Sequence, residues 1–110
     1  AGIVVGLGTD GAASNNVLEM PGEMRTAALL AKARAEDAAA LPANAALRMA
    51  TLDGARTLGL EDCTGSIETG KWADLTCIDM MHLNSQPVYD PLSHVFYYVQ
   101  PNQVCYVWVG

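Results

Sequence analysis

The feature that most constrains the fold is the apolar run GIVVGLGT at residues 2–9, which contains several β-branched side chains. A continuous run of this kind is typical of a strand that is buried on both faces, as in a parallel sheet or a barrel. Such a strand needs neighbouring strands. Asp10 follows it directly, and residues 11–16 (GAASNN) have the small, polar composition of a loop. The run therefore predicts a buried strand whose C-terminal end carries a carboxylate.

A helix is predicted after this loop, over about residues 20–35. Methionine and alanine recur there at three- and four-residue spacing. The start of the helix is open between two alternatives. Asn16 and Glu19 can form a capping box, whereas Pro21 suits the first helical position. We prefer a short capped turn that leads into a main helix from Pro21.

Two shorter helices are predicted next, over residues 42–50 and 52–58. Pro42 suits the opening of the first of them, and Thr51 can cap the second. Gly59 has the position of a glycine that ends a helix in the left-handed conformation. The middle of the chain is therefore expected to be helical.

The C-terminal half is expected to contain mainly β elements. A short strand lies between the glycine turns of residues 64–71, and further strands are predicted over 73–79 and 104–109. Asp90 as N-cap and Pro91 at the first position start a short helix between them. Its inward face is formed by apolar residues at helical spacing, namely Leu92, Val95, Phe96 and Val99. The predicted fold class is α/β.

Composition excludes several classes of protein. Of the 110 residues, 51% are hydrophobic and 16% are charged, which argues against a disordered chain. The net charge of −6 and the scattered basic residues argue against a nucleic-acid partner. No apolar run reaches the roughly 20 residues that span a bilayer. So few charges suggest that much of the surface faces other protein, either the rest of a larger fold or a second copy in a homo-oligomer.

The cysteines and histidines do not form a recognisable metal motif. Cys63, Cys77 and Cys105 are an odd number without a C-x-x-C pair, so neither a disulfide framework nor a cysteine zinc site is favoured. We expect them to be core thiols in a reducing, cytoplasmic setting. His82 and His94 are twelve residues apart without a partner at zinc-ligand spacing, and neither is expected to bind a metal.

Asp10 is the strongest candidate for catalysis, because barrel enzymes place catalytic groups at the C-terminal ends of their strands. A carboxylate that only caps the amides of the following loop is the alternative, and aspartate often serves turns in this way. Ser14 and Asn15 fit either a substrate contact or a turn. Glu23 and Arg25 fit either a pocket or a solvated helix face.

Three stretches taken together resemble the amidohydrolase superfamily. GLGTDGAASNN (6–16) with EMRTAALLAK (23–32) is similar to its last barrel strand, loop and helix. ALRMATLDGARTLGL (46–60) resembles the helices that follow, and GSIETGKWADLTCID (65–79) resembles its return to a small β-sandwich. The branch with the greatest similarity contains 5-methylthioadenosine/S-adenosylhomocysteine deaminases and triazine hydrolases.

The resemblance implies a C-terminal fragment of a metal-dependent (β/α)8 barrel that carries a small β-sandwich, because a barrel alone takes about 250 residues. Residues 1–60 would supply the last barrel strand and the following helices. Residues 61–110 would supply part of the β-sandwich. The remainder of the barrel would then be the partner of this chain.

The resemblance also implies a reaction. In the family, a divalent metal, usually zinc, is held at the barrel mouth by histidines and by an aspartate on the eighth strand, which Asp10 matches. Asp10 would be both a metal ligand and the catalytic acid and base, and Ser14 and Asn15 would contact the substrate. The expected reaction is hydrolytic deamination of an aromatic ring in a small heterocyclic substrate, such as an adenosine-type thioether nucleoside.

Alternatives remain because the histidine ligands of the family are absent from this sequence. We therefore expect the 110-residue chain by itself to bind no catalytic metal and to have no deaminase activity. A non-catalytic accessory chain that pairs with a barrel partner is the second interpretation. A stand-alone α+β domain with only an ancestral likeness is the third.

Overall fold

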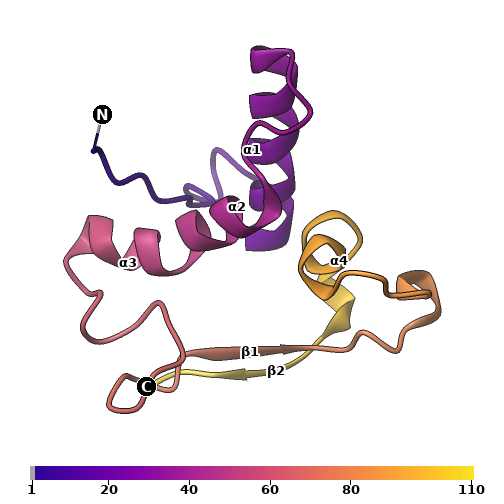
Figure 1. The fold of residues 1–110 in the computed structure, drawn as a ribbon. Helices are drawn as coiled ribbons and strands as arrows, with labels where there is room; N and C mark the ends of the chain where they lie inside the picture. The colour runs from indigo at the N-terminus through magenta and orange to yellow at the C-terminus, as the bar shows by residue number, and fades with distance from the viewer. Residues whose placement is uncertain (1) are drawn as a thin grey trace.

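Helices and a single strand pair make up the computed structural model, which describes residues 2–110 (Figure 1). In this view α1 is vertical, and α2 and α3 run roughly horizontally from its lower end. The strand pair lies below these helices, and α4 lies next to the lower end of α1. Among the described residues, no helix is both long and apolar enough to cross a membrane. The elements are α1 (Met20–Ala35), α2 (Ala43–Ala50), α3 (Leu52–Leu58), β1 (Leu75–Ile78), the 3-10 helix η1 (Leu83–Ser85), α4 (Pro91–Tyr97), the 3-10 helix η2 (Pro101–Gln103) and β2 (Val104–Trp108).

The core lies where α1, α2 and α4 meet. Met24 and Ala28 come from α1, Ala46 from α2 and Phe96 from α4, and all four are buried. The small alanine side chains allow the helix backbones to approach closely around the one large ring, that of Phe96. Burial of apolar surface in this cluster joins α4 to α1 and α2, which come much earlier in the sequence.

The start of α1 agrees with one of the two predicted alternatives. Glu19 occupies the N-cap position without a side-chain cap, and Pro21 lies in the first turn. The predicted capping box of Asn16 with Glu19 is therefore wrong. Its first member lies three residues before the N-cap, too far to reach the first free amides of the helix.

The short helices begin and end close to the predicted positions. Pro42 is the N-cap of α2, so that helix starts one residue later than expected. Thr51 precedes α3, but its hydroxyl donates to the carbonyl of Leu47 (2.7 Å) and caps no amide. Gly59 ends α3 with a left-handed φ of 70°, as predicted.

Helix α4 confirms its predicted start. The Asp90 carboxylate accepts from the backbone N–H of Ser93 (3.2 Å), and Pro91 is the first helical residue. On the predicted inward face, Phe96 and Val99 are each 1% exposed, whereas the other two apolar residues are half-buried. Periodicity therefore identified the face of α4 that enters the core.

Strands β1 and β2 pair antiparallel, with Leu75 opposite Trp108 and Cys77 opposite Tyr106. Both lie inside the predicted ranges. The short strand predicted within residues 64–71 is absent from the described residues, which form turns there. Gly65 and Gly70 both have left-handed φ values, and this curvature prevents an extended path.

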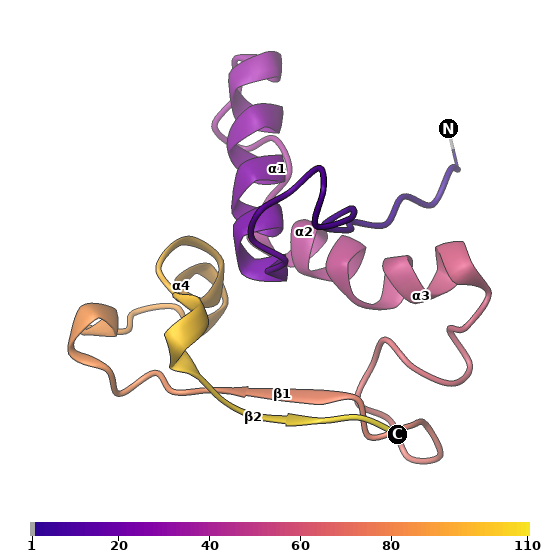
Figure 2. The same cartoon turned by 180° about the vertical axis from the view of Figure 1, so that it is seen from behind.

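The predicted buried strand over residues 2–9 is not formed. Ile3 is 79% exposed, and the segment pairs with no strand within residues 2–110. Figures 1 and 2 both show α2 and α3 between this segment and the strand pair. The backbone N–H of Leu7 instead donates to the carbonyl of Met49 (2.9 Å). A parallel strand needs partners at its edges, and the described residues provide none.

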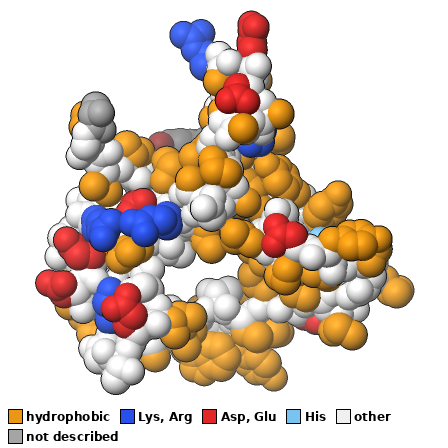
Figure 3. All heavy atoms as spheres, viewed as in Figure 1, with side chains coloured by type: hydrophobic (Ala, Val, Ile, Leu, Met, Phe, Trp, Pro, Cys, Tyr) orange, Lys and Arg blue, Asp and Glu red, His pale blue; other side chains and the backbone are white. Residues whose placement is uncertain are grey.

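The prediction that the three cysteines are core thiols is wrong for Cys77 and Cys105, which are exposed. Cys63 is half-buried. A pair of strands without a second sheet leaves one or both of its faces in solvent. Figure 3 shows hydrophobic side chains over much of the outer surface and an open gap between the helices and the strand pair. Neither a closed barrel nor a complete sandwich is present within residues 2–110.

Candidate functional site

Asp10 follows segment 2–9 and lies in an exposed turn. Its φ of 59° is left-handed, a conformation that aspartate tolerates better than most residues. The Oδ1 atom accepts from the backbone N–H of Gly11 (2.7 Å), and the Thr9 hydroxyl donates to the carbonyl of Asp10 (3.2 Å). Within residues 2–110, no donor reaches Oδ2. One carboxylate oxygen therefore caps the loop, and the other is free for a ligand.

Asn15 connects the end of this segment to helix α1. Its Nδ2 atom donates to the carbonyl of Thr9 (3.1 Å) and to Oε1 of Glu23 (2.6 Å). Its Oδ1 atom accepts from the backbone N–H of Val17 (3.2 Å). Because both the Nδ2 and the Oδ1 atoms of its side chain are hydrogen-bonded, Asn15 fixes the shape of the loop that carries Asp10.

Ser14 lies in the same loop with an exposed side chain. Its backbone N–H donates to the carbonyl of Gly11 (2.9 Å) and forms a turn. The structure therefore brings Asp10, Ser14 and Asn15 into one short loop, while the roles predicted for them stay predictions.

Glu23 and Arg25 point to different parts of the molecule. Glu23 faces the loop through its hydrogen bond with Asn15. Arg25 donates from Nη2 to the carbonyl of Val99 (3.0 Å) and from Nε to that of Phe96 (3.4 Å). Of the two, only Glu23 therefore belongs to the surroundings of Asp10, and Arg25 joins α1 to the end of α4.

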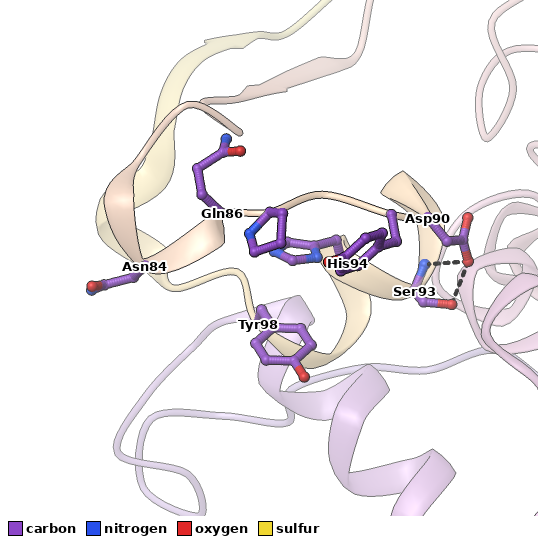
Figure 4. Close-up of a pocket in the computed structure, with 8 residues that line it drawn as sticks. Asn84, Gln86, Asp90, Ser93, His94 and Tyr98 are labelled. Atoms are coloured by element: carbon purple, nitrogen blue, oxygen red, sulfur yellow. Dashed lines mark hydrogen bonds between the residues drawn. The ribbon is translucent and has the colours of Figure 1, made fainter.

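A second candidate region is a cavity of about 300 Å³ beside α4 (Figure 4). His94 is 9% exposed, its Nε2 atom has no hydrogen-bond partner within the described residues, and its ring stacks on Tyr98 at 4.7 Å. On the sequence alone, His94 is examined only as a possible metal ligand, and this cavity is not predicted. The lining residues are Asn84, Gln86, Pro87, Tyr89, Asp90, Ser93, His94 and Tyr98.

The residues that line this cavity do not include an acid and a base that contact each other. Figure 4 shows Asp90 and Ser93 bonded to each other at one end, with Asn84 and Gln86 at the other. The Ser93 hydroxyl, followed by its backbone N–H, lowers the pKa of the Asp90 carboxyl. Asp90 thus caps α4, and His94 has no carboxylate partner within residues 2–110. The loop of Asp10 is the better candidate for catalysis.

Metal ligands do not cluster within the described part of the chain. No group of three His, Cys, Asp or Glu side chains in residues 2–110 is placed to hold an ion. Zinc takes four ligands, and carboxylate oxygens are among those that it accepts. The free oxygen of Asp10 fits the role of one ligand, and the remaining ligands would have to come from other sequence.

Comparison with known proteins decides the family. The sequence model of the Amidohydrolase family matches residues 1–110. This chain belongs to the amidohydrolase family. The resemblance inferred from the three sequence stretches is confirmed.

Curated relatives of this family member are deaminases. The 5-methylthioadenosine/S-adenosylhomocysteine deaminase of Teredinibacter turnerae is 52% identical over 109 residues, which is 99% of this chain and 25% of the relative. That of Haloarcula marismortui is 48% identical over 104 residues, or 94% of this chain and 24% of the relative. The chain thus spans about a quarter of the length of the curated relatives that it matches.

Solved structures of amidohydrolases have the same fold over this region. An adenosine deaminase from Xanthomonas campestris with bound zinc is 53% identical, with a TM-score of 0.94 over 97% of this chain and 24% of that one. The atrazine chlorohydrolase TrzN from Arthrobacter aurescens, complexed with zinc, is 35% identical, with a TM-score of 0.85 over 98% of this chain and 24% of that one. The fold of this amidohydrolase segment is therefore that of a fragment of a larger domain.

Proposed function

We propose that this amidohydrolase chain is the C-terminal part of a zinc-dependent deaminase that acts on an adenosine-type thioether nucleoside. The observation that carries the proposal is the geometry of Asp10, which follows segment 2–9 with Oδ1 held by Gly11 and with no donor on Oδ2 within residues 2–110. The identity of 52% with a 5-methylthioadenosine/S-adenosylhomocysteine deaminase supports the choice of substrate.

We further propose that residues 1–60 supply the last strand and helices of a (β/α)8 barrel, and residues 61–110 part of a β-sandwich. The remainder of the barrel is then the partner that covers the exposed segment 2–9. A homo-oligomer is compatible with the low charge content. The three free cysteines support a reducing, cytoplasmic location.

Asp10 would be one of the residues that hold the zinc, and its carboxylate would also take part in proton transfer. When bound, zinc supplies the Lewis-acid chemistry that makes water nucleophilic near neutral pH. The Gly11 amide orients the carboxylate through Oδ1. Asp10 accepts a proton from the attacking water and returns it to the leaving amine, so the ring carbon gains oxygen and ammonia departs.

The neighbouring loop residues would face the substrate. The exposed hydroxyl of Ser14 is free to hydrogen-bond with a polar substrate atom. Asn15 would act mainly by positioning, because its amide already bridges Thr9 and Glu23. A loop closed in this way keeps the Asp10 carboxylate in one orientation.

The test uses the complete polypeptide encoded by the gene, loaded with zinc, and measures ammonia release from 5-methylthioadenosine. Replacing Asp10 by Asn is expected to lower kcat about 10²- to 10⁴-fold, the usual contribution of a general acid and base. The matched control is Asp62→Asn, which changes an exposed aspartate in the loop after α3. Equal activity of Asp10→Asn and the parent would refute the role of Asp10. Hydrolysis of a chlorotriazine without deamination of the nucleoside would refute the substrate.

A further inference from the structure

Two of the three cysteines lie next to each other on the strand pair. Cys77 is on β1 and faces Tyr106 of β2, whereas the next residue of β1, Ile78, faces Val104. The register therefore skips Cys105, which is the extra residue of a β-bulge. Both thiols are free and exposed in this chain.

The bulge brings the two thiols together. In a regular antiparallel pair, side chains alternate between the faces, so Cys105 and Tyr106 would project in opposite directions. In a bulge, two residues of one strand oppose a single residue of the other, and here Cys105 and Tyr106 both oppose Cys77. The Sγ atom of Cys105 lies 3.4 Å from the carbonyl oxygen of Cys77 and donates a hydrogen bond to it.

The two side chains also affect each other electrostatically. A side-chain hydrogen bond with Cys105 raises the pKa of the Cys77 thiol, and partial burial together with the charges of Cys105 and Asp79 adds to this effect. The Cys105 thiol therefore lies against the backbone of Cys77, and the two side chains are neighbours across the strand pair. Cys63 follows α3 in a separate loop, where its carbonyl accepts from the backbone N–H of Trp72 (2.8 Å).

We propose that Cys77 and Cys105 form a dithiol modification site, which low-molecular-weight disulfides such as oxidised glutathione convert into a reversible disulfide between β1 and β2. One of the two thiolates attacks a sulfur of the small disulfide, forms a mixed disulfide and releases one small thiol. The second thiolate attacks the protein sulfur of that mixed disulfide and releases the other small thiol. The chain loses two hydrogen atoms, and the small disulfide gains them.

The site is independent of the proposed deaminase activity. Neither cysteine lies in the loop of Asp10, and neither belongs to the core around Phe96. The new bond would join the two ends of the segment that carries η1, α4 and η2. Oxidation would therefore cross-link the strand pair across this whole segment.

The experiment uses the complete polypeptide encoded by the gene, in its folded state, incubated with oxidised glutathione and digested after the remaining thiols are alkylated. Mass spectrometry is expected to find a peptide pair linked through Cys77 and Cys105, while Cys63 remains alkylated. Reduction with dithiothreitol is expected to release the link.

Two variants make the result decisive. Cys105→Ser removes the second thiol, so a stable glutathione adduct on Cys77 is expected in place of the linked pair. Cys63→Ser is the matched control and is expected to leave the linked pair unchanged. Independent glutathione adducts on both Cys77 and Cys105 in the parent would overturn the proposal. Failure of both thiols to react in the folded parent, with reaction only after unfolding, would also overturn it.

Discussion

The guanidinium of Arg25 in α1 donates to the carbonyl oxygen of Val99, 74 residues later in the sequence and just beyond α4, at 3.0 Å. A second bond reaches the carbonyl of Phe96. The last carbonyls of a helix have no partner within the helix, so a cation at this position satisfies them and complements the helix dipole.

We expect Arg25→Met to lower the free energy of unfolding by about 1.5–3 kcal/mol, the usual contribution of a hydrogen bond to a charged group. Urea unfolding of the complete polypeptide measures the change. The matched control is Arg34→Met, which replaces an exposed arginine in the last turn of the same helix. Equal losses in the two variants would show that the bonds to α4 contribute nothing specific.

Asn15→Asp is expected to destabilise the loop that carries Asp10. In the parent, Nδ2 of Asn15 lies 2.6 Å from Oε1 of Glu23. The change removes this donor and places a second carboxylate against that of Glu23. We expect a loss of about 1–3 kcal/mol in the free energy of unfolding. The second change Glu23→Gln restores a donor to the pair, so the double variant should recover part of that loss. A double variant whose loss is the sum of the two single losses would contradict the proposed contact.

Asp53 is expected to make stability depend on pH at the acid end. Its hydrogen bond with Arg48, and then the charges of Arg48 and Arg56, lower the pKa of the Asp53 carboxyl. Its contribution is therefore fully present above the unfolded pKa of about 3.9, and it is lost as the pH falls through the lower folded pKa. The parent should be more stable than Asp53→Asn in urea at neutral pH, and this difference should shrink below pH 3.9. A constant difference between the parent and Asp53→Asn across that range would refute the ion-pair explanation.

The exposed segment 2–9 is expected to make the isolated 110-residue chain associate. An apolar segment with unpaired backbone groups is a template for pairing with another chain. Sedimentation velocity should show concentration-dependent association, and Ile3→Lys should weaken it. Ile67→Lys changes an isoleucine of the turn region that is 88% exposed, compared with 79% for Ile3, and serves as the control. If both substitutions have the same effect, general hydrophobicity and not segment 2–9 causes the association.

Zinc binding provides a separate check on the fragment. The 110-residue chain is expected to bind no zinc tightly, because Asp10 alone offers one ligand to an ion that takes four. The complete polypeptide should retain one zinc through gel filtration, measured by metal analysis. Tight binding of one zinc ion by the isolated chain would show that this expectation is wrong.

Local signals in the sequence determined most of the helices and the family. Asp90 with Pro91, and Gly59, mark helix ends through contacts within a few residues, so their positions follow from residue type alone. The position of Asp10 directly after an apolar run likewise identifies it as a candidate from the sequence alone. The loop that it starts forms as expected, because its hydrogen bonds to Gly11 and Thr9 are local.

Only the tertiary structure decided the contacts that join distant parts of the chain. The bond from Arg25 to Val99 depends on how α1 packs against α4, and no local period predicts it. The bulge that brings Cys105 beside Cys77 depends on strand register. Segment 2–9 has the composition of a buried strand, yet a strand forms only where partner strands supply its hydrogen bonds, and within residues 2–110 none does.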